Sequence, residues 1–199
     1  MKTPDFFESI EKIALKDPLA EILGAMENGE YETSYLEVVK SAGHSCPTVA
    51  GAYIMTLEAL KALYDGRRAI RGDIEVAFKE SLEEGVAGVI ANVVTQITGA
   101  TDKSGFKGLG NQFTRHSLMQ FNAEITSSAR FTARSSGKSV EVFYDHSMIP
   151  ANPNMMPLMQ KIMAKDATQE ERELFGEMWQ ERVRKIFENI PQVLILKQN

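Results

Sequence analysis

The sequence predicts an α+β fold, in which a small antiparallel or mixed sheet packs against several helices. Apolar residues recur every three or four positions from Val49 to Tyr64, which is the helical period. Ile74, Val76 and Phe78 alternate with Glu, Ala and Lys, which indicates a half-buried strand. Helices and strands do not alternate regularly along the chain, so the pattern favours α+β over a repeated βαβ unit.

Before the central helix, the chain is expected to form two helices and a strand. Residues 6–14 have apolar side chains at helical spacing, and Asp17-Pro18 ends this helix. A second short helix follows around Ile22. Residues 31–39 are expected to form a strand that leads into a loop.

The second half of the chain is expected to contain two helices and a hairpin. Residues 86–97 have helical spacing and end at a glycine. Residues 131–134 and 139–144 read as two strands joined by a tight turn. Thr168, with a glutamate three residues later, predicts the capped start of a long helix whose apolar stripe includes Trp179.

The chain is expected to divide into three segments: an N-terminal helical extension (residues 1–30), a core (31–147), and a lid with a C-terminal helix (148–199). Five methionines cluster around the prolines of this lid, at Met148, Met155, Met156, Met159 and Met163. Methionine fills irregular apolar surfaces, which favours an adaptable lid or a dimer contact over a soft-metal contact.

Composition and charge exclude several classes of protein. Of the 199 residues, 43% are hydrophobic and 25% are charged, which excludes a wholly disordered chain. The net charge of −5 argues against nucleic-acid partners, which need a basic surface. No run approaches roughly 18 apolar residues, and the first residues lack the apolar region of a signal peptide. We therefore expect no membrane association and a cytoplasmic location.

The most informative residues surround the single cysteine, Cys46. One cysteine forms no intrachain disulfide, dithiol pair or all-cysteine zinc site. Pro47 suits the first position of a helix, which places Cys46 at the N-cap, where the helix dipole favours a thiolate. His44 lies two residues earlier, and a His/Cys pair suits zinc or another late transition metal. The alternative is a small buried cysteine beside a surface histidine.

Further candidate ligands or proton donors are His116, after a glycine-rich stretch, and His146, after the predicted hairpin. The alternative for each is a solvated polar residue. The glycine-rich stretch over residues 99–110 lacks the arrangement of a phosphate-binding loop. A third hypothesis makes Cys46 a nucleophile with His44 as its base, although a two-residue separation seldom holds that geometry.

Four motifs resemble those of the FmdE family, which is named for a component of formylmethanofuran dehydrogenase, the molybdenum or tungsten enzyme of methanogenesis. They are Gly43-His44-Ser45-Cys46-Pro47, Thr98-Gly99-Ala100-Thr101, Gly108-Leu109-Gly110-Asn111, and the helix Leu174-Phe175-Gly176-Glu177-Met178-Trp179-Gln180-Glu181-Arg182. The resemblance implies an α+β core that dimerises and a metal site near the His-x-Cys motif. It implies the core-only type, because the chain lacks cysteines for the zinc finger that some relatives carry.

The chain departs from the family pattern at three positions. Ala100 stands where the family usually has cysteine, Leu109 where it has lysine, and Asn92 where aspartate is common. A mechanism that needs two core thiols is therefore not expected here.

These observations lead to two hypotheses of function. The first is a homodimeric metal-binding protein in which His44 and Cys46 hold zinc or another late transition metal, completed by His116 or His146. Its open coordination positions would take a small-molecule ligand or activate water. The second is a non-catalytic accessory or cofactor-delivery module for a molybdenum or tungsten oxidoreductase. Both carry a link to one-carbon metabolism and leave the reaction open.

Overall fold

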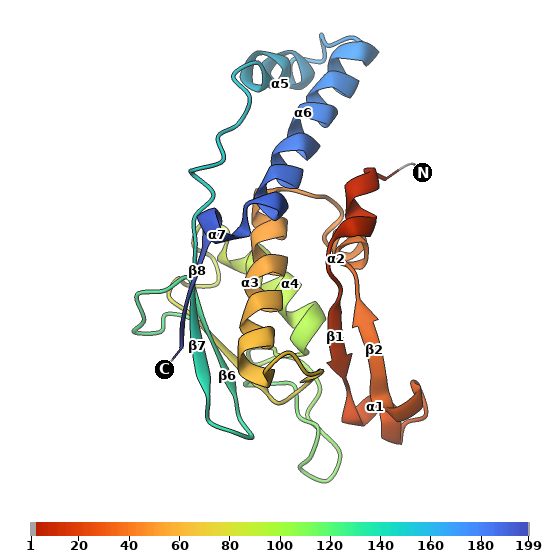
Figure 1. Cartoon of the computed structure of the whole chain (residues 1–199), viewed down its shortest axis with the longest axis vertical. Coiled ribbons are helices and arrows are strands. Elements are labelled where there is room, and N and C mark those ends of the chain that lie inside the picture. The colour runs from red at the N-terminus through yellow and green to blue at the C-terminus, as the bar shows by residue number, and fades with distance from the viewer. Residues whose placement is uncertain (1–2, 199) are drawn as a thin grey trace.

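Two mixed sheets flank a central helix, α3 (Pro47–Tyr64), in the computed structural model, which describes residues 3–198 (Figure 1). One sheet has the order β2-β1-β3, and the other has the order β5-β4-β6-β7-β8. The strands are β1 (Ile13–Lys16), β2 (Glu30–Thr33), β3 (Ala69–Ile70), β4 (Ile74–Phe78), β5 (Met119–Gln120), β6 (Ala129–Ala133), β7 (Ser139–Tyr144) and β8 (Leu194–Gln198). This arrangement confirms the predicted α+β fold.

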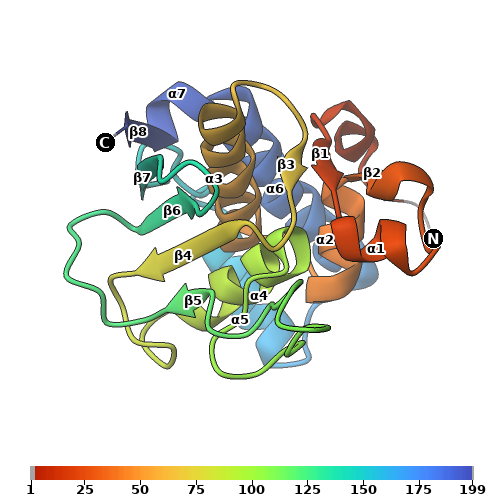
Figure 2. The same cartoon turned by 90° about the horizontal axis from the view of Figure 1, so that it is seen from below.

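Helix α3 is buried on nearly all sides because its residues are small or apolar around its whole circumference. It lies between the two sheets with α4 (Ala87–Thr98) beside it (Figure 2). Tyr53 and Ile54 are fully buried at its middle. One continuous hydrophobic core contains residues from all three predicted segments, from Phe7 to Leu194.

The N-terminal predictions need two corrections. Residues 6–14 do not form a helix: Asp5–Ser9 is a short 3-10 turn, and Ile13 begins strand β1. Ile13 and Leu15 point into the core on one face of that strand, and this alternation decides the structure over the helical spacing. The predicted strand over residues 31–39 is also wrong beyond Thr33.

A capping box explains the second correction. The side chain of Ser34 accepts a hydrogen bond from the backbone N–H of Glu37, whose carboxylate binds the backbone N–H of Ser34. Such a box starts a helix, here α2 (Tyr35–Ala42). The predicted short helix is present as α1 (Pro18–Ile22), and a second 3-10 turn (Glu27–Gly29) leads into β2.

The later predictions are confirmed. Helix α4 ends at Gly99, whose left-handed backbone (φ 77°) suits glycine. Strands β6 and β7 form the predicted antiparallel hairpin. Helix α6 (Gln169–Glu188) starts at the capping box of Thr168 and Glu171.

The C-terminal segment forms an arm and then returns to the sheet. Helix α5 (Met155–Met163) and the first half of α6 project from the body (Figure 1). The predicted lid is thus an extended linker followed by a helix. Helix α7 (Ile190–Val193) then leads into β8, which pairs with β7 at the sheet edge. Within residues 3–198, no helix combines the length and the apolar character needed to span a bilayer.

Candidate functional site

Cys46 caps the N-terminus of α3, as the sequence predicts. Its backbone is extended (φ −148°, ψ 170°), and its Sγ accepts a hydrogen bond from the backbone N–H of Val49 at 3.4 Å. Pro47 occupies the first helical position, where its missing N–H costs nothing. The thiol is free and half-buried. The N–H groups at the start of α3 favour negative charge on this sulfur.

Three side chains from distant segments hold the loop before α3. Trp179 Nε1 and Gln180 Nε2 on α6 donate to the carbonyl of Ser45 at 2.8 and 3.3 Å. The Tyr35 hydroxyl on α2 shares a hydrogen bond of 2.9 Å with Ser45 Oγ. Ser45 is therefore buried, while its two neighbours in the motif keep access to solvent.

Tyr144 provides a further contact, which the sequence analysis did not single out. It lies at the end of β7, and its hydroxyl donates to the carbonyl of Pro47 at 2.7 Å. A Cβ on Gly51 would lie 2.2 Å from its ring, so this close approach requires glycine in α3. Burial raises the pKa of Tyr144 above its ordinary value near 10, which keeps the hydroxyl a neutral donor. A glycine one turn into a buried helix was the signal available.

His44 is exposed beside this loop, and its ring orientation is set by one contact. Nδ1 lies 3.1 Å from the carbonyl oxygen of Ala42. A carbonyl only accepts, so this hydrogen bond assigns the proton to Nδ1 and leaves a lone pair on Nε2. Metal-binding histidines commonly have this tautomer, held in this way by a backbone carbonyl.

His146 has the opposite arrangement. Its Nδ1 lies 3.2 Å from a guanidinium nitrogen of Arg182, which only donates, so the neutral ring carries its proton on Nε2. Arg182 also donates to the carbonyl of Ile149 at 2.8 Å and so ties the linker to α6. The His146 ring packs edge-on against Tyr144 at 5.8 Å between centroids. His146 therefore presents a hydrogen-bond donor on the same side of the molecule as the start of α3.

His116 makes its side-chain contact within its own loop, where Nδ1 lies 3.0 Å from Ser117 Oγ. Across residues 3–198, no three His, Cys, Asp or Glu side chains group closely enough to hold a metal ion. The four histidine and cysteine candidates, His44, Cys46, His116 and His146, therefore do not form one complete ligand set within this chain.

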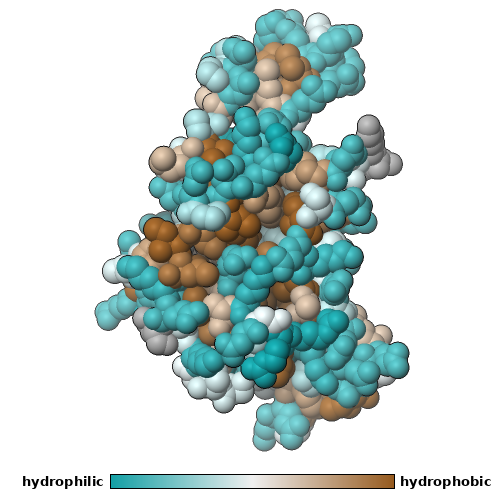
Figure 3. All heavy atoms as spheres, in the orientation of Figure 1, coloured by the Kyte–Doolittle hydropathy of each residue, from teal (hydrophilic) through white to brown (hydrophobic). Residues whose placement is uncertain are grey.

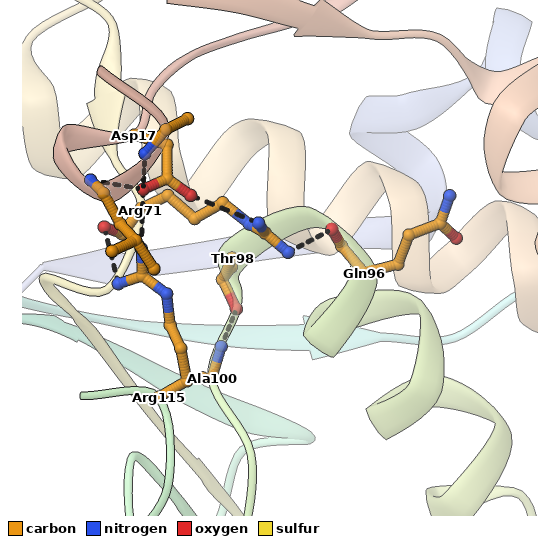
Figure 4. A network of polar contacts seen from close by, with 8 residues as sticks. Asp17, Arg71, Gln96, Thr98, Ala100 and Arg115 are labelled. Carbon is orange, nitrogen blue, oxygen red and sulfur yellow. Dashed lines mark hydrogen bonds and ion pairs between the residues drawn. The ribbon is translucent and has the colours of Figure 1, made fainter. Parts of the chain in front are cut away.

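The glycine-rich stretch is anchored by a buried charge network (Figure 4). Asp17 accepts from Arg115 at 2.7 Å and from Arg71 at 3.2 Å. Asp17 and Arg115 are 4% and 7% exposed, so this ion pair is shielded from water. Burial lowers the pKa of Arg115, and the charge of Asp17 opposes that shift. Arg115 lies close against Gly72, where any Cβ would overlap its guanidinium.

This network was missed because its members look unrelated in sequence. Asp17 was interpreted only as part of a helix end, yet it both caps α1, through the backbone N–H of Leu19, and pairs with the two arginines. Arg115 also fixes the glycine-rich stretch, because Thr101 donates to its carbonyl from both backbone and side chain. Ala100, at the position of the missing cysteine, is fully buried.

A cleft of about 590 Å³ opens at one end of the five-stranded sheet, where β4 and β7 end and β6 and β8 begin. Its volume is in the range of small-molecule sites. Ser127 lines it, is 1% exposed, and has no hydrogen-bond partner for its hydroxyl among the described residues. Tyr144 and His146 line it too, whereas His44 and Cys46 do not. Figure 3 shows apolar surface on this side, around α7 and β8, where Ile195 is 60% exposed.

Comparisons with known proteins agree with the motifs. A family model described as "FmdE, Molybdenum formylmethanofuran dehydrogenase operon" matches residues 42–195. Among solved structures, an FmdE-like protein of tungsten formylmethanofuran dehydrogenase from Syntrophus aciditrophicus matches with 17% identity and a TM-score of 0.43, over 83% of this chain and 72% of that chain. No curated protein matches the chain.

Proposed function

The chain belongs to the FmdE family, and we propose that its His44–Cys46 pair binds zinc or another late transition metal. The observation that carries this proposal is the tautomer of His44. The carbonyl of Ala42 holds the Nδ1 proton, so Nε2 is ready to act as a ligand two residues before the thiol. Imidazole nitrogen and thiolate sulfur are the donors that zinc prefers.

The two donors fit part of a metal site. Zinc takes four ligands in a tetrahedron, and the described residues offer no third His, Cys, Asp or Glu beside this pair. We propose that the remaining ligands come from a second copy of the chain or from a bound small molecule. A homodimer is therefore part of the proposal. A metal with open positions would polarise such a molecule or lower the pKa of a bound water.

The surrounding residues would keep the two donors in place. The N–H of Val49 and the dipole of α3 stabilise the thiolate of Cys46. Trp179 and Tyr144 fix the two peptide carbonyls on either side of that cysteine. Neither contact uses the donor atoms themselves, so the pair stays available.

A second candidate function is that of an accessory module for an oxidoreductase. The family is associated with formylmethanofuran dehydrogenase, and the arm of α5 and α6 offers a surface for such a partner. Met156 and Met163 on the arm are 61% and 72% exposed, and Leu174 is 43% exposed. Exposed methionines suit adaptable protein contacts.

Metal analysis of the purified full chain tests the first function. We expect bound zinc, or another late transition metal, in the wild type and its loss in His44→Ala/Cys46→Ala. His116→Ala is the matched control, because it removes an imidazole that contacts only its own loop, and it should retain the metal. Equal metal content in the double variant and the wild type would contradict the proposal. Gel filtration with and without a chelator reports whether a second copy supplies the missing ligands.

A further inference from the structure

We propose that the cleft at the end of the five-stranded sheet binds a small carboxylate with an apolar tail. The cleft is separate from the proposed metal pair, because neither His44 nor Cys46 lines it. The proposal therefore stands or falls independently of metal binding.

The floor of the cleft is apolar and comes from four different elements. Met55 on α3, Phe78 on β4, Ala87 on α4 and Val193 on α7 are each at most 2% exposed. Because these residues are already packed in the core, the floor is preformed. An apolar tail laid on it would lose contact with water without a rearrangement of the protein.

One end of the cleft is rich in hydrogen-bond donors. Thr48 lies in the first turn of α3, whose backbone N–H groups have no partners within the helix. His146 directs its Nδ1 at Arg182, so its Nε2–H remains as a donor. From Thr48 to Met55 the helix rises about 10 Å, which separates a polar end from an apolar end. Donors beside an apolar floor suit a carboxylate head and a tail.

The acidic residues of the rim do not cancel this preference. The carboxylate of Asp145 accepts from the backbone N–H and the hydroxyl of Ser147, at 2.8 and 2.9 Å, and is thereby satisfied. Glu80 is the other acid on the rim, and Lys79 beside it carries the opposite charge. The dipole of α3 then leaves a positive potential at the Thr48 end.

Ser127 supplies an independent observation. Its hydroxyl is buried in the wall of the cleft and has no partner among residues 3–198. Buried polar groups in proteins are generally hydrogen-bonded, and exceptions mark sites that await a partner. A carboxylate oxygen would accept from this hydroxyl.

Calorimetric titration of the full chain with octanoate tests the proposal, with octanol and octylamine as matched probes of the same length. We expect saturable binding of octanoate that is about tenfold tighter than that of octylamine, because the donors and the helix dipole reject a cation. The His44→Ala/Cys46→Ala variant should bind octanoate like the wild type. This result separates the proposal from metal binding.

Substitution at Thr48 identifies the position of the head group. Thr48→Asp places a negative charge where a first helical turn tolerates it, so the variant should fold, yet octanoate should bind about tenfold more weakly. Thr48→Asn, which has nearly the same shape without the charge, should retain binding, and octanol should not distinguish the two variants. His146→Phe should weaken octanoate and leave octanol unchanged. Absence of saturable binding, equal binding of octylamine, or full binding by Thr48→Asp would each overturn the proposal.

Discussion

Two loops that carry the family's motifs are fixed in opposite ways. The loop before α3 is held by neutral donors, Trp179, Gln180 and Tyr144, that bind its backbone carbonyls. The glycine-rich stretch is held by a buried ion pair between Asp17 and Arg115. A neutral hydrogen bond contributes about 1 kcal/mol, whereas breaking a buried ion pair costs about 3–5 kcal/mol.

The difference separates a site from a framework. In the first loop the fixing groups grip the main chain, so the side chains of His44 and Cys46 are left for chemistry. In the second loop the charged side chains of Asp17, Arg71 and Arg115 are consumed by one another and by nearby carbonyls. We infer that the glycine-rich motif serves the fold, and that the His-x-Cys motif serves function.

The largest expected effect comes from removing the charge of Asp17. Asp17→Ala leaves two guanidinium groups close together and buried, and it removes the N-cap of α1. We expect a loss of about 3–5 kcal/mol in the free energy of unfolding, measured by urea denaturation. The rate at which Cys46 reacts with a thiol reagent under native conditions should not change, because the loop before α3 has other anchors.

An exposed ion pair provides the control. Glu32 lies 3.8 Å from Lys12, and both side chains are at least 50% exposed, so Glu32→Ala should cost less than about 1 kcal/mol. A similar cost for Asp17→Ala and Glu32→Ala would show that the buried network is not the framework we infer.

The sequence predicted local features of this comparison and missed assembled ones. The N-cap role of Cys46 depends only on Pro47 and the helical period after it, and the structure confirms it. The network of Asp17 and Arg115 joins residues 98 positions apart, and no local pattern links them. The cleft is likewise built from elements spread along the whole chain.

The wrong predictions have the same origin. Residues 6–14 have helical spacing, but pairing of β1 with β2 and β3 buries Ile13 and Leu15 as a strand, so tertiary contacts decide. The helix after Ser34 could have been found, because its capping box with Glu37 is a local signal.

A medium effect is expected where the two modes of fixing meet the central helix. Gly51→Ala places a methyl group against the ring of Tyr144, which must move and give up its bond to Pro47. Overpacking costs about 1–3 kcal/mol, and the helix propensity of alanine returns up to about 1 kcal/mol. We expect a net loss of stability in thermal unfolding and faster modification of Cys46.

Gly176 in α6 is the matched glycine for this test. A Cβ there would meet nothing within 4 Å, so Gly176→Ala should raise stability by up to about 1 kcal/mol without affecting the thiol. If Gly51→Ala also stabilised the protein, the contact between α3 and Tyr144 would not constrain the loop.

The smallest expected effect is the most specific to the loop before α3. Trp179→Phe removes the donor to the carbonyl of Ser45, while Gln180 keeps its longer bond to the same oxygen. We expect a loss of about 1 kcal/mol, and about fivefold faster modification of Cys46, because the loop opens more often by that free energy. Phe175→Leu perturbs the ring that packs on Trp179 without touching the bond, so it should destabilise α6 and leave the thiol rate unchanged. If both variants changed the thiol rate equally, packing of α6 alone, and not the carbonyl contact, would hold the motif in place.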